Sequence, residues 1–278
     1  QDYLKRDDTL GNCPIVSLIK KPGATPKDDA NKLMAALDLE PTELRGLKNK
    51  GEALLHLIDK LEAQQVLVAQ SAKNYMPQQM PEGASFSGMT VKDKKVPFIF
   101  IASGDEGEKF EPLGRRVFTL ILLAVLIARG RFVTATYNGH TPNKTSEREY
   151  AITAEILMPE ADFRTADLND LDAIQAVSDS FKVTPSAVVM RARRLGLLTK
   201  DEAIRYFTEL DAAYVANPFM RSARGFKALL KYNGPECSRR MLTLYDSRTV
   251  NTGEFCRVMF SRKYRNERFI NDFRAVVP

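Results

Sequence analysis

The spacing of hydrophobic residues predicts a helical beginning, a short β region and a helical remainder. From about Asp29, apolar residues recur at helical intervals. Residues 64–70 have the apolar character of a short strand, and residues 85–93 alternate like an exposed strand. Residues 94–103 carry the unbroken apolar run of a central strand. We therefore expect an α+β fold with a small sheet of about three strands packed against helices.

The most apolar segment of the chain spans residues 117–128, in which Thr119 is the only polar residue. Twelve helical residues cover roughly 18 Å, which is shorter than the ~30 Å hydrocarbon core of a bilayer. Arginines stand at both ends of the segment: Arg115, Arg116, Arg129 and Arg131. We predict a helix buried on all sides, from about residue 113 to 129, and no membrane partner.

Three more helices are predicted between residues 168 and 208. The first two are joined by the short turn Lys-Val-Thr, and the second begins Thr-Pro-Ser. Two helices joined in this way form the helix-turn-helix pattern. The third helix begins after Thr199, which is a suitable N-cap residue.

These patterns divide the chain into four segments. Residues 1–28 are polar and turn-rich and predict a flexible arm. Residues 29–165 hold the predicted sheet and its helices, and residues 166–210 hold the helix-turn-helix-like subdomain. Residues 211–278 predict a basic helical tail, because residues 220–278 contain 13 Lys and Arg against 5 Asp and Glu.

The composition of the chain excludes few classes of function. The formal net charge is +6 and the sequence pI is near 9.1, which permits an acidic partner without requiring one. The three cysteines form no Cys-x-x-Cys motif and cannot all pair with one another. This cysteine usage indicates a reducing compartment, so we expect a cytoplasmic protein.

Three segments, in this order, resemble the ImmA/IrrE (DUF955) family of zinc-dependent endopeptidases. Residues 96–120 contain VPFIFIAS followed by GRRVFTL, residues 149–159 read EYAITAEILMP, and residues 176–203 include FKVTPSAVVMRARRLGLL. Residues 231–255 are similar to the C-terminal tail of longer members. The resemblance implies zincin-like helices packed on the small sheet, followed by the helix-turn-helix-like subdomain and the basic tail.

The zinc motif of that family is missing. In the family, the helix after Phe-Thr-Leu continues as His-Glu-x-x-His, whose two imidazoles share one helix face and bind one zinc ion. The corresponding positions here are Leu122, Leu123 and Leu126. The two histidines of the chain, His56 and His140, are far apart in sequence. We therefore expect no metal, no cofactor and no catalytic residue at this site.

The third ligand of the family is an acidic residue just upstream of the Glu-Ile-Leu-Met-Pro segment. Glu147 and Glu149 lie near that place, on either side of Arg148. We interpret these three residues as a solvated helix start, because two missing imidazoles leave an acid with no metal to hold. A cysteine–histidine nucleophile has no supporting spacing either.

The predicted function is that of an inactive pseudo-peptidase that works as a regulatory binding protein. The resemblance implies that active relatives cleave helix-turn-helix repressors in mobile-element or stress-response circuits. A member without zinc is expected to hold such a repressor, or a related protein, without cutting it.

The alternative is a nucleic-acid-binding protein that uses the helix-turn-helix-like segment and the basic tail. Aromatic residues are interleaved with the basic residues of the tail, which suits nucleic acid or simply a helical core. The sequence does not predict the oligomeric state. The candidate nucleic-acid or partner contacts are Arg191, Arg193, Arg194, Arg239, Arg240, Arg262, Lys263, Arg265 and Arg268.

Overall fold

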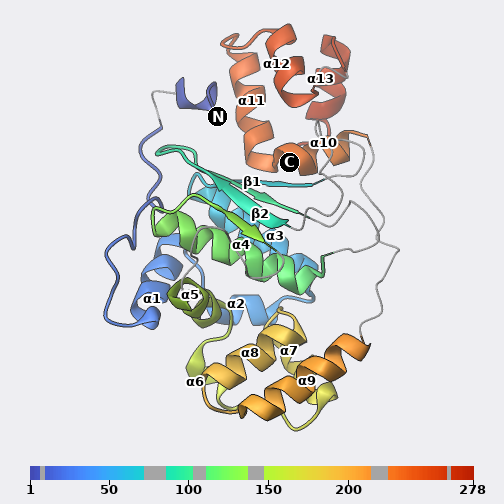
Figure 1. Cartoon of the computed structure of the whole chain (residues 1–278). Helices are drawn as coiled ribbons and strands as arrows, with labels where there is room; N and C mark the ends of the chain where they lie inside the picture. The colour runs from blue at the N-terminus through green and yellow to red at the C-terminus, as the bar shows by residue number, and fades with distance from the viewer. Residues whose placement is uncertain (7–9, 72–85, 103–110, 137–146, 214–224, 262–263) are drawn as a thin grey trace.

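The computed structural model describes residues 1–6, 10–71, 86–102, 111–136, 147–213, 225–261 and 264–278. These residues form an α+β fold with thirteen α-helices, one short 3-10 helix and one sheet (Figure 1). The helices before and beside the sheet are α1 (Pro26–Leu37), α2 (Pro41–Gly46), α3 (Lys50–Ala63), α4 (Leu113–Ala128), α5 (Glu147–Leu157) and α6 (Glu160–Phe163). The later helices are α7 (Leu171–Ser180), α8 (Pro185–Arg194), α9 (Lys200–Ala213), α10 (Phe226–Asn233), α11 (Pro235–Asp246), α12 (Thr252–Met259) and α13 (Glu267–Arg274).

The sheet is mixed and has the strand order β1-β3-β2-β4. Its strands are β1 (Leu67–Gln70), β2 (Phe86–Val91), β3 (Phe98–Ile101) and β4 (Thr134–Thr136). Strand β1 runs parallel to β3, with Leu67 opposite Phe98, and the other two pairings are antiparallel. Three strands occupy the predicted places. The fourth, β4, is a correction to the expected sheet of about three strands.

The sheet lies between two helical layers (Figure 1). On one side α4 packs against β2 and β3, and α3 packs against β1. On the other side α10 and α11 approach β1. Gly234, between α10 and α11, permits this approach, because a Cβ there would lie 2.2 Å from the carbonyl oxygen of Val68. Its φ of +87° also favours glycine.

The N-terminal segment is not the free arm that its composition predicts. Ile15 and Ile19 are completely buried in the main core. Two backbone hydrogen bonds fasten this segment to the end of α4: Ser17 N donates to Ile127 O at 3.1 Å, and Ile19 N donates to Ala128 O at 2.9 Å. Leu4 packs into the separate core of the C-terminal helices. Single apolar residues among turns anchor the segment without any helical or strand periodicity.

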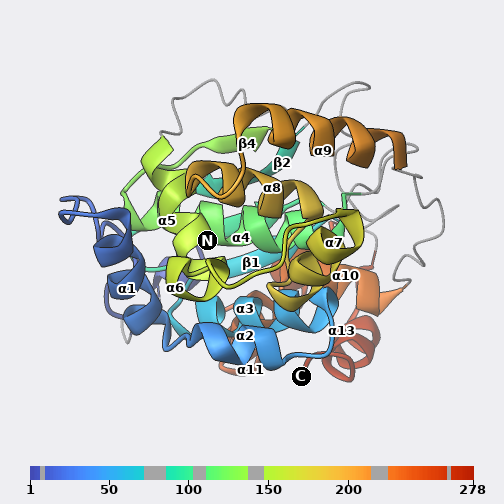
Figure 2. The ribbon, with the colours of Figure 1, turned by 90° about the horizontal axis from the view of Figure 1, so that it is seen from below.

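Helices α7, α8 and α9 form a compact group, here named the α7–α9 unit, in which α8 contacts both α7 and α9. Figure 2 shows α8 in front of α4. Thr184 caps α8 by accepting a hydrogen bond from Ala187 N at 3.2 Å. Gly114, in the first turn of α4, touches the turn between α7 and α8. A Cβ on Gly114 would lie 2.4 Å from the carbonyl of Val183. Since Val183 and Val188 belong to the main core, the predicted boundary near residue 166 does not separate two cores.

Helices α10–α13 have their own core, in which Phe255, Phe260 and Phe273 are completely buried. These rings pack in tilted and edge-to-face pairs, such as Phe260 with Phe273 at 5.4 Å between centroids. The aromatic residues interleaved in the basic tail are therefore largely the core of this bundle. A buried ring is not accessible to a nucleic-acid base.

Candidate functional site

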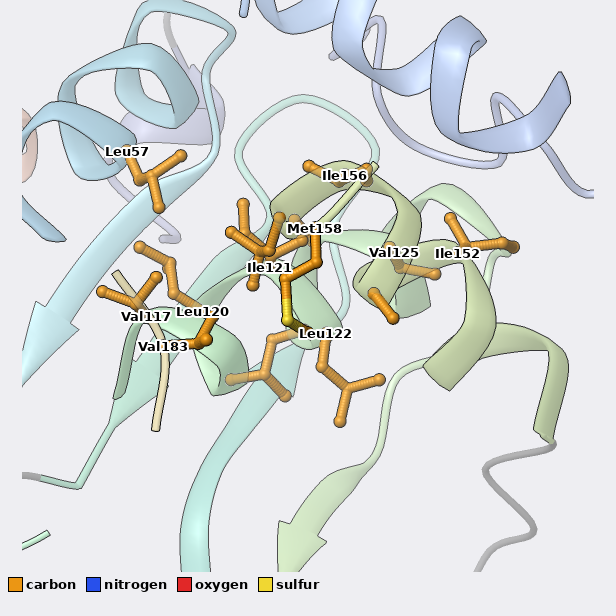
Figure 3. Close-up of a cluster of buried hydrophobic side chains, with 14 of the residues drawn as sticks. Leu57, Val117, Leu120, Ile121, Leu122, Val125, Ile152, Ile156, Met158 and Val183 are labelled. Carbon is orange, nitrogen blue, oxygen red and sulfur yellow. The ribbon is translucent and has the colours of Figure 1, made fainter. Parts of the chain in front are cut away.

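Helix α4 places Leu122, Leu123 and Leu126, at which the resemblance expects a zinc motif, in apolar surroundings. Leu123 and Leu126 are completely buried, and Leu122 is 5% exposed. In Figure 3 the side chain of Met158, from the end of α5, points toward Leu122. The three positions therefore belong to the core, with Leu122 at its boundary.

No helix in the described part of the chain is long and apolar enough to cross a membrane.

Leu122 forms part of the wall of a cavity of about 360 Å³ between α4 and the α7–α9 unit. We name it the α4–α8 cavity. Its walls come from α4, α5, α8 and α9, and two sheet residues, Ser87 of β2 and Ala135 of β4, also border it. In Figure 2, which views the molecule from below, α8 lies in front of α4. Its lining residues are Ser87, Arg115, Phe118, Thr119, Leu122, Ala135, Tyr150, Ala154, Met158, Thr184, Ser186, Ala187, Met190, Arg191, Arg194 and Phe207.

Three arginines reach this cavity, and Arg191 is held by its own partners. Its guanidinium forms a buried ion pair with Glu155 of α5 and donates a hydrogen bond from Nε to Met158 O at 3.2 Å. Arg191 is only 6% exposed. The prediction that Arg191 contacts nucleic acid or a partner therefore needs correction: its side chain joins α8 to α5 inside the fold.

Arg193 and Arg194, by contrast, are exposed. The Arg194 guanidinium lies 5.9 Å from the centroid of the Tyr150 ring, which is a cation–π arrangement. The Tyr150 ring in turn stacks with Phe118 of α4 at 6.4 Å. Arg194 lines the cavity, whereas Arg193 does not. The two neighbouring arginines thus face different surroundings.

A buried carboxyl group lies near the cavity at the start of α4. Glu111 is 2% exposed, and burial raises its pKa to about 7. The Ser87 hydroxyl and the positive charges of Arg115 and Arg116 oppose this increase. Arg116 also donates a hydrogen bond to Gln70 at the end of β1. Two of the groups that act on Glu111, Ser87 and Arg115, also line the cavity, so this part of its wall is polar.

The predicted solvated helix start at the beginning of α5 is wrong for Glu149. Glu149 is completely buried and forms ion pairs with Arg129 and Arg131, each at 3.2 Å. Arg148 pairs with the buried Asp29 of α1 at 2.7 Å. Only Glu147 is exposed, as expected. The charged residues here connect α5 to α1 and α4, and sequence cannot show such long-range pairing.

The basic residues of the C-terminal bundle have different surroundings. Arg239 and Arg240 both form ion pairs with Glu236 in the same helix, Arg240 at 2.7 Å. Arg265 and Arg268 are exposed near α13. Arg262 and Lys263 lie outside the described residues, as does His140. His56 lies in α3, with its Nε2 3.4 Å from a carboxylate oxygen of Glu43.

Sequence reasoning located the leucines but missed the cavity and most of its lining. Phe118, Tyr150 and Met190 belong to helices that the sequence predicts, yet nothing in their spacing shows that they surround one space. Their half-buried or exposed apolar side chains would be the only signal. Among the described residues, no three His, Cys, Asp or Glu side chains gather where a metal ion would bind.

Comparisons with known proteins do not identify a family. No protein-family model matches this chain, and no curated protein sequence matches it significantly.

Proposed function

We propose that this chain is a catalytically inactive relative of the ImmA/IrrE endopeptidases and that it acts by binding a regulatory protein of the helix-turn-helix repressor class. In this interpretation α4 corresponds to the zinc-binding helix, the sheet with α3–α5 to the zincin-like part, and α7–α8 to the helix-turn-helix-like subdomain. The interpretation rests on the resemblance of the sequence motifs and on the environment of α4.

The observation that carries the proposal is the packing of Leu122, Leu123 and Leu126. A pocket that once held a metal and lost it would leave buried polar groups without partners, which is costly. Leucine at these positions removes that cost, and each buried leucine contributes roughly 1.5–3 kcal/mol. The α4–α8 cavity still borders Leu122, so a cleft is kept beside a helix that cannot ligate zinc through these residues.

Two measurements test this proposal. The purified full chain is incubated with zinc, dialysed and analysed for bound metal, and we expect less than stoichiometric zinc. Tagged protein is then captured from its native host with and without nuclease, and any retained repressor is purified and mixed with the chain. We expect binding that survives nuclease and leaves the repressor intact. Stoichiometric zinc together with repressor cleavage would overturn the proposal.

Nucleic-acid binding is the second candidate, and exposed arginines favour it: Arg193 on α8, with Arg265 and Arg268 near α13. The position of α8 opposes it. A recognition helix presents its N-terminal residues to the major groove, but Ser186 and Ala187 of α8 face the α4–α8 cavity.

Binding to a DNA duplex at increasing salt distinguishes this second candidate. Contacts to phosphates predict affinity that falls steeply with salt and falls further when Arg193 and Arg268 are changed to alanine. Arg205→Ala, an exposed arginine of α9, is the matched control. Affinity that is absent, or that ignores salt, contradicts nucleic-acid binding.

A further inference from the structure

We propose that the α4–α8 cavity binds a small organic carboxylate with an apolar body, of the size of a medium-chain fatty acid, and that Arg194 holds its carboxylate. This inference is independent of the protein partner proposed above. The volume of about 360 Å³ lies near the lower end of the ~300–1,000 Å³ range of small-molecule sites.

The charge of the cavity indicates an anionic ligand. Three arginines line it, and none of its described lining residues is Asp or Glu. Arg191 is neutralised by Glu155, and Arg115 lies in the field of the buried Glu111. Among the described residues, no carboxylate lies within ion-pair distance of Arg194. This arginine is therefore the cation of the cavity that remains for a ligand.

Arg194 also has the geometry of an anion-binding side chain. Its guanidinium packs over the Tyr150 ring at 5.9 Å, and this contact limits the positions that the long side chain adopts. A guanidinium binds a carboxylate through two parallel hydrogen bonds, which are stronger than hydrogen bonds between neutral groups. A partly ordered arginine loses less conformational freedom when it makes them.

The remaining walls carry the hydroxyl groups of Ser87, Thr119, Thr184 and Ser186 but are otherwise mostly apolar, which suits a ligand with an apolar body. The apolar side chains come from four helices and from Met158, which follows α5: Phe118, Leu122, Ala154, Met158, Met190 and Phe207. Methionine adapts its shape to different apolar ligands because its side chain is unbranched and polarisable. An aliphatic chain in contact with these side chains would be removed from water, which is favourable in proportion to its buried area.

A ligand in this place would touch two parts of the fold at once. The walls include side chains of α4 and α5 as well as side chains of α8 and α9. The α7–α9 unit is otherwise fastened here by the Arg191–Glu155 pair and the close contact at Gly114. Binding would therefore stabilise the docked position of the α7–α9 unit.

The test uses the full chain and decanoate, with isothermal titration calorimetry and thermal unfolding below the micelle-forming concentration. Decanol is the neutral control with the same chain, and acetate is the anionic control without it. We expect decanoate to bind at least about tenfold more tightly than either control. We also expect decanoate to raise the unfolding temperature.

Variants locate the site. Arg194→Met should weaken decanoate binding about tenfold, whereas Arg193→Met, at the neighbouring arginine outside the cavity, should leave it unchanged. Ala187→Phe should abolish binding by filling the cavity, provided that its circular dichroism shows a folded chain. The proposal fails if decanoate does not bind, if decanol binds as tightly, or if Arg194→Met and Arg193→Met behave alike.

Discussion

Leu123 of α4 lies directly against Gly88 of β2: its Cδ1 is 2.8 Å from the place that a Cβ on Gly88 would occupy. The carbonyl oxygen of Phe100 would be only 2.6 Å from the same Cβ. The helix and the sheet approach this closely because Gly88 has no side chain. The position where the resemblance expects a catalytic glutamate is therefore part of the contact between helix and sheet.

Gly88→Ala should destabilise the fold by about 1–3 kcal/mol, because the added methyl group overpacks the contact with Leu123 and the Phe100 carbonyl. Gly46→Ala is the matched control, since no atom lies within 4 Å of its added Cβ. That change should be neutral or stabilising by up to about 1 kcal/mol. Urea unfolding measures both variants, and equal stabilities would contradict the described packing.

Histidine should lower the stability of the fold more at Leu126 than at Leu122. Leu126 is completely buried, so Leu126→His leaves an imidazole without partners and should lower the unfolding free energy by more than about 3 kcal/mol. Leu122 lines the cavity, where an imidazole can reach water, and Leu122→His should cost roughly half as much. Leu126→Met, with a similar volume, should cost less than about 1.5 kcal/mol. The reverse order for the two histidine variants would show that the cavity does not face Leu122.

The Arg191–Glu155 pair should behave as a buried ion pair. Arg191→Met alone leaves the buried carboxylate of Glu155 unpaired and should cost about 3–5 kcal/mol. Replacing both residues with methionine should cost clearly less than the sum of the two single changes. Arg193→Met, at an exposed position, should stay within about 0.5 kcal/mol of the parent chain. A double-mutant cycle measures the coupling, and additive effects would exclude the pair.

Local patterns predict most elements of this fold but few of its long-range contacts. The buried helix predicted at residues 113–129 is confirmed as α4 (Leu113–Ala128). A long apolar run bounded by arginines fits few structures other than a buried helix. Strand β4 was missed because three residues, Thr134–Thr136, carry too little pattern. Ile15 and Ile19 were missed because isolated apolar residues have no period.

The candidate site was harder to predict for a physical reason. Arg191 and Arg194 are three residues apart on one helix, so their sequence spacing predicts a shared face. Their different roles depend on Glu155, which lies 36 residues away and pairs with only one of them. The cavity itself is a property of how α8 packs on α4 and α5. No local pattern contains that information.

Two buried carboxyl groups should make the stability of this protein decrease as the pH rises toward neutrality. Burial raises the pKa of Glu62 and of Glu111 from 4.5 to about 7. Between these values the folded chain binds more protons than the unfolded chain, so the unfolding free energy falls with increasing pH. Each group should contribute a loss on the order of 2–3 kcal/mol between pH 4.5 and 7.

Glu62→Gln isolates one of these contributions. Glu62 joins α3 to the beginning of α11, because its Oε2 accepts a hydrogen bond from Glu236 N at 3.1 Å. A glutamine oxygen can accept the same bond without a charge, so the variant should be more stable than the parent at pH 7.5 and similar to it near pH 4.5. Glu52→Gln, at an exposed position in the first turn of the same helix, is the matched control. If Glu62→Gln keeps the full pH dependence of the parent chain in urea unfolding, then Glu62 is ionised in the folded protein and its burial does not control the titration.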